Sequence, residues 1–235
     1  MSRPVGTGEW VDLSQPLYED MPRAVPESEV CFTPQSLPTG PPGTEVRITN
    51  LLLSTHVGTH IDAALHFLPD GKAIEQYPVD AFVGPGVVID ARRDGVVPVT
   101  LAEIEAMNPD VREGDIVFFC FGYGRRFGTE EYRDHPYLGD DLAVWLAERG
   151  VKMVGVDTTT PDLGGKHRPP DYPYPVHMTL LPRDILVVEH LGPRLEELAG
   201  RRVEINAVPL PIRGGDGAPA PVIARPVSDS HEENR

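Results

Sequence analysis

The chain has 235 residues with 36 acidic and 21 basic side chains, and its formal charge of −15 disfavours nucleic acid and anionic membranes as partners. A hydrophobic content of 40% with 24% charged residues is typical of globular proteins, while 26 prolines and 23 glycines indicate many turns. The chain has only two cysteines, no apolar run near ~20 residues and no signal-peptide core, so we expect it to be cytoplasmic. Because its charge disfavours nucleic acid and membranes, we expect a small-molecule ligand.

Strands and helices alternate along the predicted chain. Strands are expected at 10–13, 46–54, 87–91, 115–121, 152–157, 185–188, 203–212 and 221–227, and helices at 100–107, 140–149 and 193–199. A long arm or loop is expected at 16–44, and a tight loop in "RGGDGAPAP" at 213–221. Thr100 and Glu103 form a capping-box pattern, and Gly150 is a helix stop. The succession of strand, helix and strand between 115 and 157 predicts a parallel crossover. We expect one α/β domain over residues 1–227 and a disordered tail at 228–235.

The stretch "STHVGTHIDAALH" at 54–66 concentrates three histidines and one carboxylate. In an extended strand, His56 and His60 would lie about 13 Å apart, too far for one ion. A bend at Gly58 would instead fold His60 back beside His56, because glycine adopts such a bend at little cost. Two imidazoles and Asp62 could then converge on a metal such as zinc. A single histidine in a turn is more often a surface or hydrogen-bonded residue, so the prediction depends on the combination with Asp62 and His66.

Several segments of the chain resemble a known family in order. The segment "HVGTHIDAALH" resembles the His-x-Gly-Thr-His-x-Asp-x-Pro-x-His signature of the cyclase family of metal-dependent hydrolases, which includes bacterial kynurenine formamidase and isatin hydrolase. The segments "VDLSQPLYEDMP", "GVDTTTPD", "PVHMTLLPRDILVVEHL" and "GAPAPVIA" also match. In the formamidase branch, the resemblance implies one metal on His56, His60 and Asp62, a second on Asp62, His177 and Glu189, and His66 as the general acid/base. Ala64 stands in place of the signature proline, and His190 where many members have asparagine.

The resemblance also implies a fold and an activity. The expected fold is of the swivelling β/β/α type with mixed sheets, assembled as a homodimer or larger oligomer. The expected reaction is hydrolysis of an amide, lactam or lactone with one or two divalent ions, Zn²⁺ or Mn²⁺, per chain. A polyketide-type cyclase using the same metal site is the first alternative, and a non-catalytic module that keeps the metal for structure is the second.

Four residues are candidates for substrate binding. Arg125 is a candidate partner for a substrate carboxylate, although an exposed arginine is also typical of a solvated face. Tyr172 and Tyr174 would line the site from a proline-rich loop, or pack that loop. Thr158, at the end of a strand, would either donate to the substrate or close a turn.

Overall fold

A computed structural model describes residues 5–23 and 29–227, so the predicted tail at 228–235 lies outside the described residues. The main sheet has nine strands in the order β1-β13-β11-β5-β7-β9-β10-β4-β12, and two further sheets pair β2 with β3 and β6 with β8. The strands are β1 (Val11–Asp12), β2 (Cys31–Pro38), β3 (Glu45–Leu52), β4 (His60–Asp62), β5 (Val83–Asp90), β6 (Pro98–Val99), β7 (Ile116–Cys120), β8 (Tyr137–Leu138), β9 (Met153–Val156), β10 (Leu186–Glu189), β11 (Arg202–Asn206), β12 (Gly217–Pro219) and β13 (Ile223–Pro226). The predicted mixed α/β fold is confirmed.

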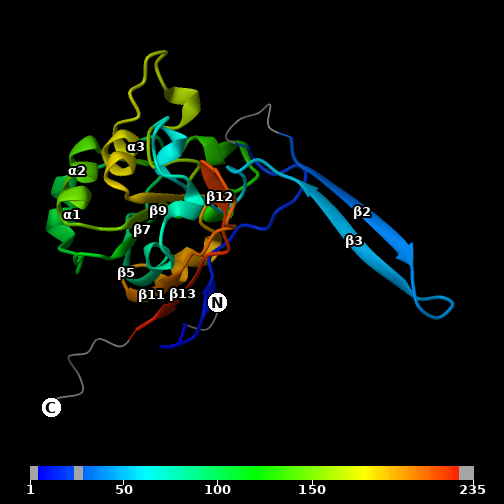
Figure 1. Ribbon diagram of the computed structural model, residues 1–235. Helices are drawn as coiled ribbons and strands as arrows, with labels where there is room; N and C mark the ends of the chain where they lie inside the picture. The colour runs from blue at the N-terminus through cyan, green and yellow to red at the C-terminus, as the bar shows by residue number, and fades with distance from the viewer. Residues whose placement is uncertain (1–4, 24–28, 228–235) are drawn as a thin grey trace.

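The helices are short, and the three α-helices lie on one side of the main sheet (Figure 1). They are α1 (Leu101–Met107), α2 (Asp140–Glu148) and α3 (Pro175–Leu180). The 3₁₀ helices are η1 (Ala64–His66), η2 (Ile74–Gln76), η3 (Val79–Ala81), η4 (Gly124–Arg126), η5 (Glu130–Arg133), η6 (Gly165–His167), η7 (Leu181–Arg183) and η8 (Pro193–Leu198).

The centre of the main sheet is parallel and buried on both faces. Strands β5, β7, β9 and β10 run parallel, and antiparallel strands continue the sheet on either side. Successive side chains of β7 point to opposite faces. Phe119 therefore belongs to the same buried cluster as Leu142 of α2 and Ile104 of α1, whereas Phe118 belongs to the cluster on the other face, with Leu195 of η8. Such continuous burial explains why this strand reads as an unbroken apolar run.

Two local predictions are confirmed by the structure. The parallel crossover is formed by β7, α2 and β9. The side chain of Thr100 accepts a hydrogen bond from the backbone N–H of Glu103, and the Glu103 carboxylate accepts from the N–H of Thr100 at 2.8 Å. This capping box satisfies donors that the first turn of α1 would otherwise leave unpaired.

The loop predicted over 16–44 and the strand predicted at 46–54 are wrong in part. Strand β2 occupies 31–38 and pairs antiparallel with β3, so the two form a hairpin arm that extends away from the body of the molecule (Figure 1). Prolines 34 and 38 suggested a loop, but each strand of an isolated hairpin has a free edge where the missing N–H of proline is tolerated. Strand β3 therefore belongs to the arm and ends at Leu52, before the histidine cluster.

The loop predicted for "RGGDGAPAP" is also wrong in part, because Gly217–Pro219 is the edge strand β12 and pairs with β4. A Cβ atom on Gly217 would lie 2.6 Å from the backbone oxygen of Ile61 and 2.9 Å from Cε1 of His56. Glycine is therefore required for β12 to approach β4 this closely. The strand predicted at 203–212 is shorter than expected and ends at Asn206.

Candidate metal centre

Strand β4 places the central residues of the histidine cluster inside the main sheet. The chain bends at Gly58, whose φ of 57° is the left-handed conformation that glycine adopts readily, and then enters β4. His60 and Asp62 are two residues apart on this strand and therefore point to the same face. In the antiparallel register, His60 lies opposite Glu189 of β10. Directly opposed side chains on one face are close neighbours, so strand pairing alone brings Glu189 to the cluster.

The ring of His60 is fully buried, and its inner nitrogen faces two carboxylates. The Nδ1 atom lies 2.9 Å from the carbonyl oxygen of Gly58, to which it donates. The Nε2 atom consequently carries a lone pair, and it lies 3.3 Å from Asp62 Oδ1 and 3.4 Å from Glu189 Oε2. Within the described part of the chain, this Nε2 has no hydrogen-bond partner. Three electron-rich atoms directed at one point fit a cation between them.

His177 of α3 repeats this arrangement from the other side. Its Nδ1 donates to Oδ2 of Asp162 at 2.5 Å, while Nε2 lies 3.3 Å from Asp62 Oδ2 and 3.4 Å from Glu189 Oε1. Burial opposes protonation of His177, but hydrogen bonds to these carboxylates raise its pKa well above the usual value. A ring whose outer N–H is held by a carboxylate has the fixed tautomer and orientation typical of metal-ligating histidines.

Asp62 and Glu189 each present one oxygen to His60 and the other to His177. Asp62 uses Oδ1 toward His60 and Oδ2 toward His177, and Glu189 uses Oε2 and Oε1 in the same way. Burial opposes ionisation of Asp62, yet hydrogen bonds to His177 and His56, together with the nearby His60 ring, hold its pKa well below the usual value. The ligand atoms of Asp62, His177 and Glu189 lie within 4.8 Å of one another. The residues present therefore fit a divalent metal.

His56 and His66 lie together at the outer side of the cluster. His56 contacts Asp62 Oδ1 through Nδ1 and Asp216 Oδ2 through Nε2, both at 2.8 Å. Burial opposes its protonation, but these contacts with Asp216 and Asp62 raise its pKa to about 10. The His66 ring lies 3.9 Å from the His56 ring, its Nδ1 is 3.4 Å from Asp216 Oδ2, and 31% of its side chain is exposed. His56, Asp62 and His66 are a further group whose spacing could hold an ion.

Sequence reasoning did not find Asp162 or Asp216. Asp162 ends the segment "GVDTTTPD" that the resemblance quoted, and Asp216 lies in the predicted loop "RGGDGAPAP", but a lone aspartate in a turn has many ordinary roles. Asp216 immediately precedes β12 and reaches His56 only because β12 pairs with β4. No local pattern indicates this long-range pairing.

The four predicted substrate-binding residues occupy different surroundings. Tyr174 is half-buried, with its ring 5.1 Å from Phe67 and 6.5 Å from His177, whereas the hydroxyl of Tyr172 donates to Asp162 at 3.2 Å. Thr158 is buried and its hydroxyl donates to the carbonyl of Thr160 at 2.9 Å, which closes a turn. Arg125 has an exposed side chain paired with Glu196 at 2.7 Å.

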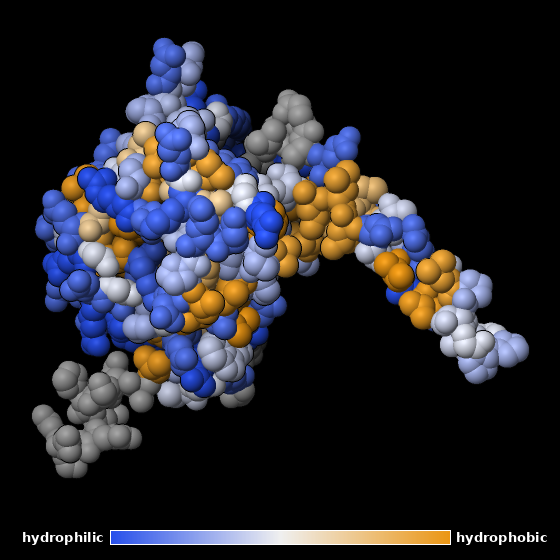
Figure 2. Space-filling model, in the orientation of Figure 1, coloured by the Kyte–Doolittle hydropathy of each residue, from blue (hydrophilic) through white to orange (hydrophobic). Residues whose placement is uncertain are grey.

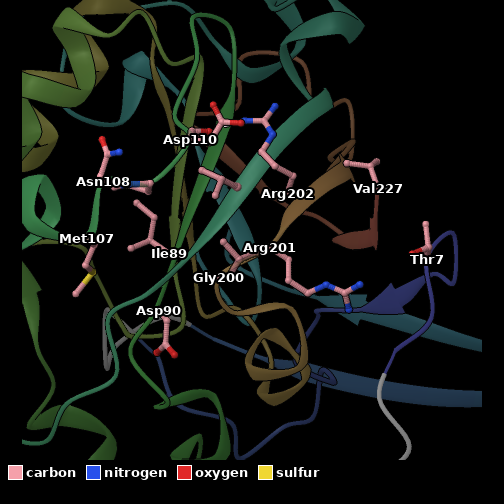
Figure 3. A pocket seen from close by; sticks show the side chains of 13 residues that line it. Thr7, Ile89, Asp90, Met107, Asn108, Asp110, Gly200, Arg201, Arg202 and Val227 are labelled. Atoms are coloured by element: carbon pink, nitrogen blue, oxygen red, sulfur yellow. Dashed lines mark hydrogen bonds between the residues drawn. The ribbon is translucent and has the colours of Figure 1, made fainter. Parts of the chain in front are cut away.

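A separate hollow lies beside the carboxyl half of β5. It has a volume of about 1040 Å³ and is lined by residues that include Ile89, Met107 and Asn108, with Arg201 and Arg202 (Figure 3). None of the predicted metal, catalytic or substrate residues lines it. Arg201 donates to the carbonyl of Val5, and Arg202 pairs with the buried Asp115. Its two arginines are thus used in holding the fold together.

The fold and the cluster define an α/β protein with a His/Asp/Glu site suited to divalent metal. The family model described as "Putative cyclase" matches residues 11–163, and a kynurenine formamidase of Bacillus cereus is 30% identical over 227 residues, covering 94% of this chain and 99% of that enzyme. The chain belongs to this cyclase family. Isatin hydrolase A from Ralstonia solanacearum has a similar structure, with a TM-score of 0.78 and 27% identity over 92% of this chain and 91% of that one. A protein described as a potential metal-dependent hydrolase with cyclase activity gives a TM-score of 0.72 at 27% identity, over 94% and 98%. The predicted family is confirmed.

Proposed function

We propose that this chain is a metal-dependent hydrolase that opens a carbon–nitrogen amide bond in a small aryl substrate, with Zn²⁺ or Mn²⁺ as the metal. The observation that carries the proposal is the buried Nε2 of His60, which faces oxygens of Asp62 and Glu189 and has no hydrogen-bond partner among the residues that the structure describes. The names of the relatives, kynurenine formamidase and isatin hydrolase, support amide hydrolysis in particular.

Two ions per chain agree best with the way the carboxylates are shared. Each of Asp62 and Glu189 turns one oxygen to His60 and the other to His177. The two carboxylates would therefore help to hold one ion at His60 and a second ion at His177. His56 is the further predicted ligand, beside the His60 position. When bound, such ions polarise a carbonyl group and lower the pKa of water toward ~7.

We assign the proton transfer to His66. Its Nδ1 is directed toward Asp216 Oδ2, and it is more exposed than His56, His60 and His177. Its other nitrogen, Nε2, would take a proton from the attacking water and deliver it to the leaving nitrogen of the substrate. A positioned acid/base of this kind contributes about 10² to 10⁴ in rate.

Aromatic rings beside the cluster favour an aryl substrate. Phe67 follows His66 directly and stacks on the ring of His177 at 4.7 Å and 18°. Tyr174 closes on the edge of Phe67, and the guanidinium of Arg168 lies 4.5 Å from the Tyr174 ring centre. Such rings bury an aromatic group with defined geometry. Tyr174 therefore remains our proposed substrate contact.

Metal content and turnover, measured on the same samples, test the proposal. We expect one to two ions per chain, loss of both metal and activity in His60→Ala, and a loss of about 10² to 10⁴ in turnover with metal retained in His66→Ala. His167→Ala, which changes an exposed histidine paired with Asp134, is the matched control. An aryl formamide and an aryl lactam serve as substrates, and hydrolysis adds one water to the product mass. A product of unchanged mass, or one that has lost water, would instead support the cyclase alternative.

We also propose that the chain forms a homodimer through the β2–β3 arm. Paired residues share a face of a hairpin, and one face carries no charge (the neutral face: Cys31, Thr33, Gln35, Leu37, Val46, Ile48, Asn50 and Leu52). All eight residues are exposed, and apolar side chains run along the arm (Figure 2). The opposite face holds both charges, Glu45 and Arg47. An isolated hairpin is only marginally stable in water, so we expect another protein surface to pack against this face.

We infer that a second copy of this chain covers the neutral face. Two bodies of formal charge −15 repel each other, and contact through uncharged arms places no charge in the interface. A twofold axis also makes one face complementary to itself. Sedimentation velocity should show a dimer that Ile48→Lys dissociates, while Thr49→Lys on the opposite face leaves it intact. A monomeric wild type would overturn the proposal.

A further inference from the structure

His190 follows Glu189 in an uncommon backbone conformation. Its φ is 59°, which is left-handed and disfavoured for a residue with a side chain. Its N–H donates to the carbonyl of Thr158 at 3.0 Å, and its carbonyl accepts from the hydroxyl of Thr59 at 2.7 Å. In a continuing strand, the residue after Glu189 would point to the opposite face of the sheet. Here a ring nitrogen of His190 instead lies within 4.8 Å of the ligand atoms of His60 and Glu189.

The imidazole of His190 has one partnered nitrogen and one without a partner. Its Nδ1 lies 2.9 Å from the hydroxyl of Tyr132, a residue with no exposed surface. Its Nε2 is buried and, in the ranges 5–23 and 29–227, has no hydrogen-bond partner. The His190 ring centre is 5.6 Å from that of His60. The two rings that carry these nitrogens are therefore neighbours, and the Nε2 of His60 is already accounted for as a lone pair directed at a cation.

Hydrogen-bond accounting decides which atom of His190 carries the proton. The phenol of Tyr132 keeps its proton at neutral pH, and among the described residues Nδ1 of His190 is the acceptor that this hydroxyl has. If Tyr132 donates to Nδ1, the neutral ring carries its hydrogen on Nε2. The reverse assignment would orphan both the Tyr132 hydrogen and the Nε2 lone pair. Nε2 is therefore a donor, and a protonated nitrogen cannot bind metal.

We propose that Nε2–H of His190 donates a hydrogen bond to the carbonyl oxygen of the substrate, and that Tyr132 is the positioning residue that fixes this tautomer. The inference rests on the proposed amide hydrolysis, since a carbonyl oxygen gains negative charge when water adds to its carbon. A buried donor that is already oriented stabilises that charge without reorganisation. Thr59 and Thr158 hold the strained backbone that directs the ring inward.

Three variants of the metal-loaded protein test the donor by steady-state kinetics on formanilide. His190→Ala should lower kcat by about 10² to 10³ with KM changed less than about threefold, the range for loss of one such donor. His190→Gln places an amide N–H near the same point and should recover activity to within about tenfold of wild type. Tyr132→Phe should lower kcat less than His190→Ala. Metal content and thermal unfolding are measured on each sample, and loss of metal in His190→Ala in parallel with activity would identify a ligand and overturn the proposal.

A second measurement does not depend on turnover. Nitrogen-15 spectra of labelled histidine in the zinc-loaded protein, assigned by the signal missing from His190→Gln, should show hydrogen on Nε2 and none on Nδ1. Saturating benzamide, which offers the same carbonyl group, should shift the Nε2–H resonance. Hydrogen found on Nδ1 overturns the inference. An Nε2–H resonance that does not shift at saturating benzamide, whether benzamide binds elsewhere or does not bind, also overturns it. A wild type that hydrolyses neither aryl formamide nor aryl lactam overturns the proposed function instead, whatever these spectra show.

Discussion

Replacing Asp162 with asparagine should weaken metal binding although Asp162 is outside the predicted ligand set. Its Oδ2 accepts from Nδ1 and from the backbone N–H of His177, and its Oδ1 accepts from the N–H of Val176 and the hydroxyl of Tyr172. Asparagine keeps one acceptor oxygen and replaces the other with a donor. Either the His177 ring or the first turn of α3 then loses its partner, and the ring loses the full negative charge behind it.

The expected loss is a factor of about 10 to 100 in metal affinity, the scale observed when the outer partner of a ligating histidine is removed. This corresponds to about 1.4 to 2.8 kcal/mol. The inner Nε2 of His177 contacts both Asp62 and Glu189, so a ring free to rotate weakens contacts with two ligands at once. Binding at the His60 position should change less, because the His60 ring is oriented by the Gly58 carbonyl.

Competition of zinc between the protein and a chromophoric chelator measures this loss directly. Asp90→Asn is the matched control, since it makes the same change at a half-buried aspartate paired with Arg92. Thermal unfolding of the metal-free proteins separates lost affinity from lost stability. An Asp162→Asn protein that folds normally and binds both ions within about threefold of wild type would refute the assignment of His177 as a ligand oriented by Asp162.

Three further changes test the structure around the site. Gly217→Ala should separate β12 from β4 and displace His56, lowering activity, whereas Gly165→Ala, with no atom within 4 Å of the added Cβ, should be neutral in the same assay. Asp157→Asn should lower the free energy of unfolding in urea by about 1 to 3 kcal/mol, because Asp157 accepts four backbone N–H groups and an amide leaves at least one unpaired. Burial lowers the pKa of His135 to about 4, so the unfolded state gains the proton first as pH falls. The free energy of unfolding should therefore fall by up to about 3 kcal/mol between pH 6.5 and 4. The His135→Gln variant, measured in urea over the same pH range, should lack this part of the pH dependence.

The local features of the fold could be predicted because each depends on neighbours in sequence. The capping box at Thr100 and Glu103 joins residues three positions apart, and the buried run at 116–120 shows its environment in its own composition. The motif around His60 is equally local, since Gly58 supplies the bend and a two-residue spacing puts Asp62 on the same face as His60. The alternation of expected strands and helices also predicted a mixed α/β fold, and the quoted motif segments resembled the family that the comparisons confirm.

Strand β2 of the arm and the edge strand β12 were missed because prolines and glycines are found both in loops and at sheet edges. In a loop, glycine adopts positive φ and proline fixes φ for a turn; at a sheet edge, proline lacks an N–H that would have no partner, and glycine lets the strands approach closely. The choice depends on what lies beside the segment. For β12 the neighbour is β4, more than 150 residues earlier in the chain.

The sequence by itself determined which residue types gather near His60, and hence that a divalent metal is the fitting ligand. Only the tertiary structure decided how they converge: the register of β10 against β4 sets Glu189 opposite His60, and α3 brings His177 against Asp162. It also decided that the ring of His190 turns inward, through a left-handed backbone held by two threonines. The physical reason is that nitrogen and oxygen atoms bind an ion only within a few ångströms of each other, and distances across strands depend on pairing that no short segment contains.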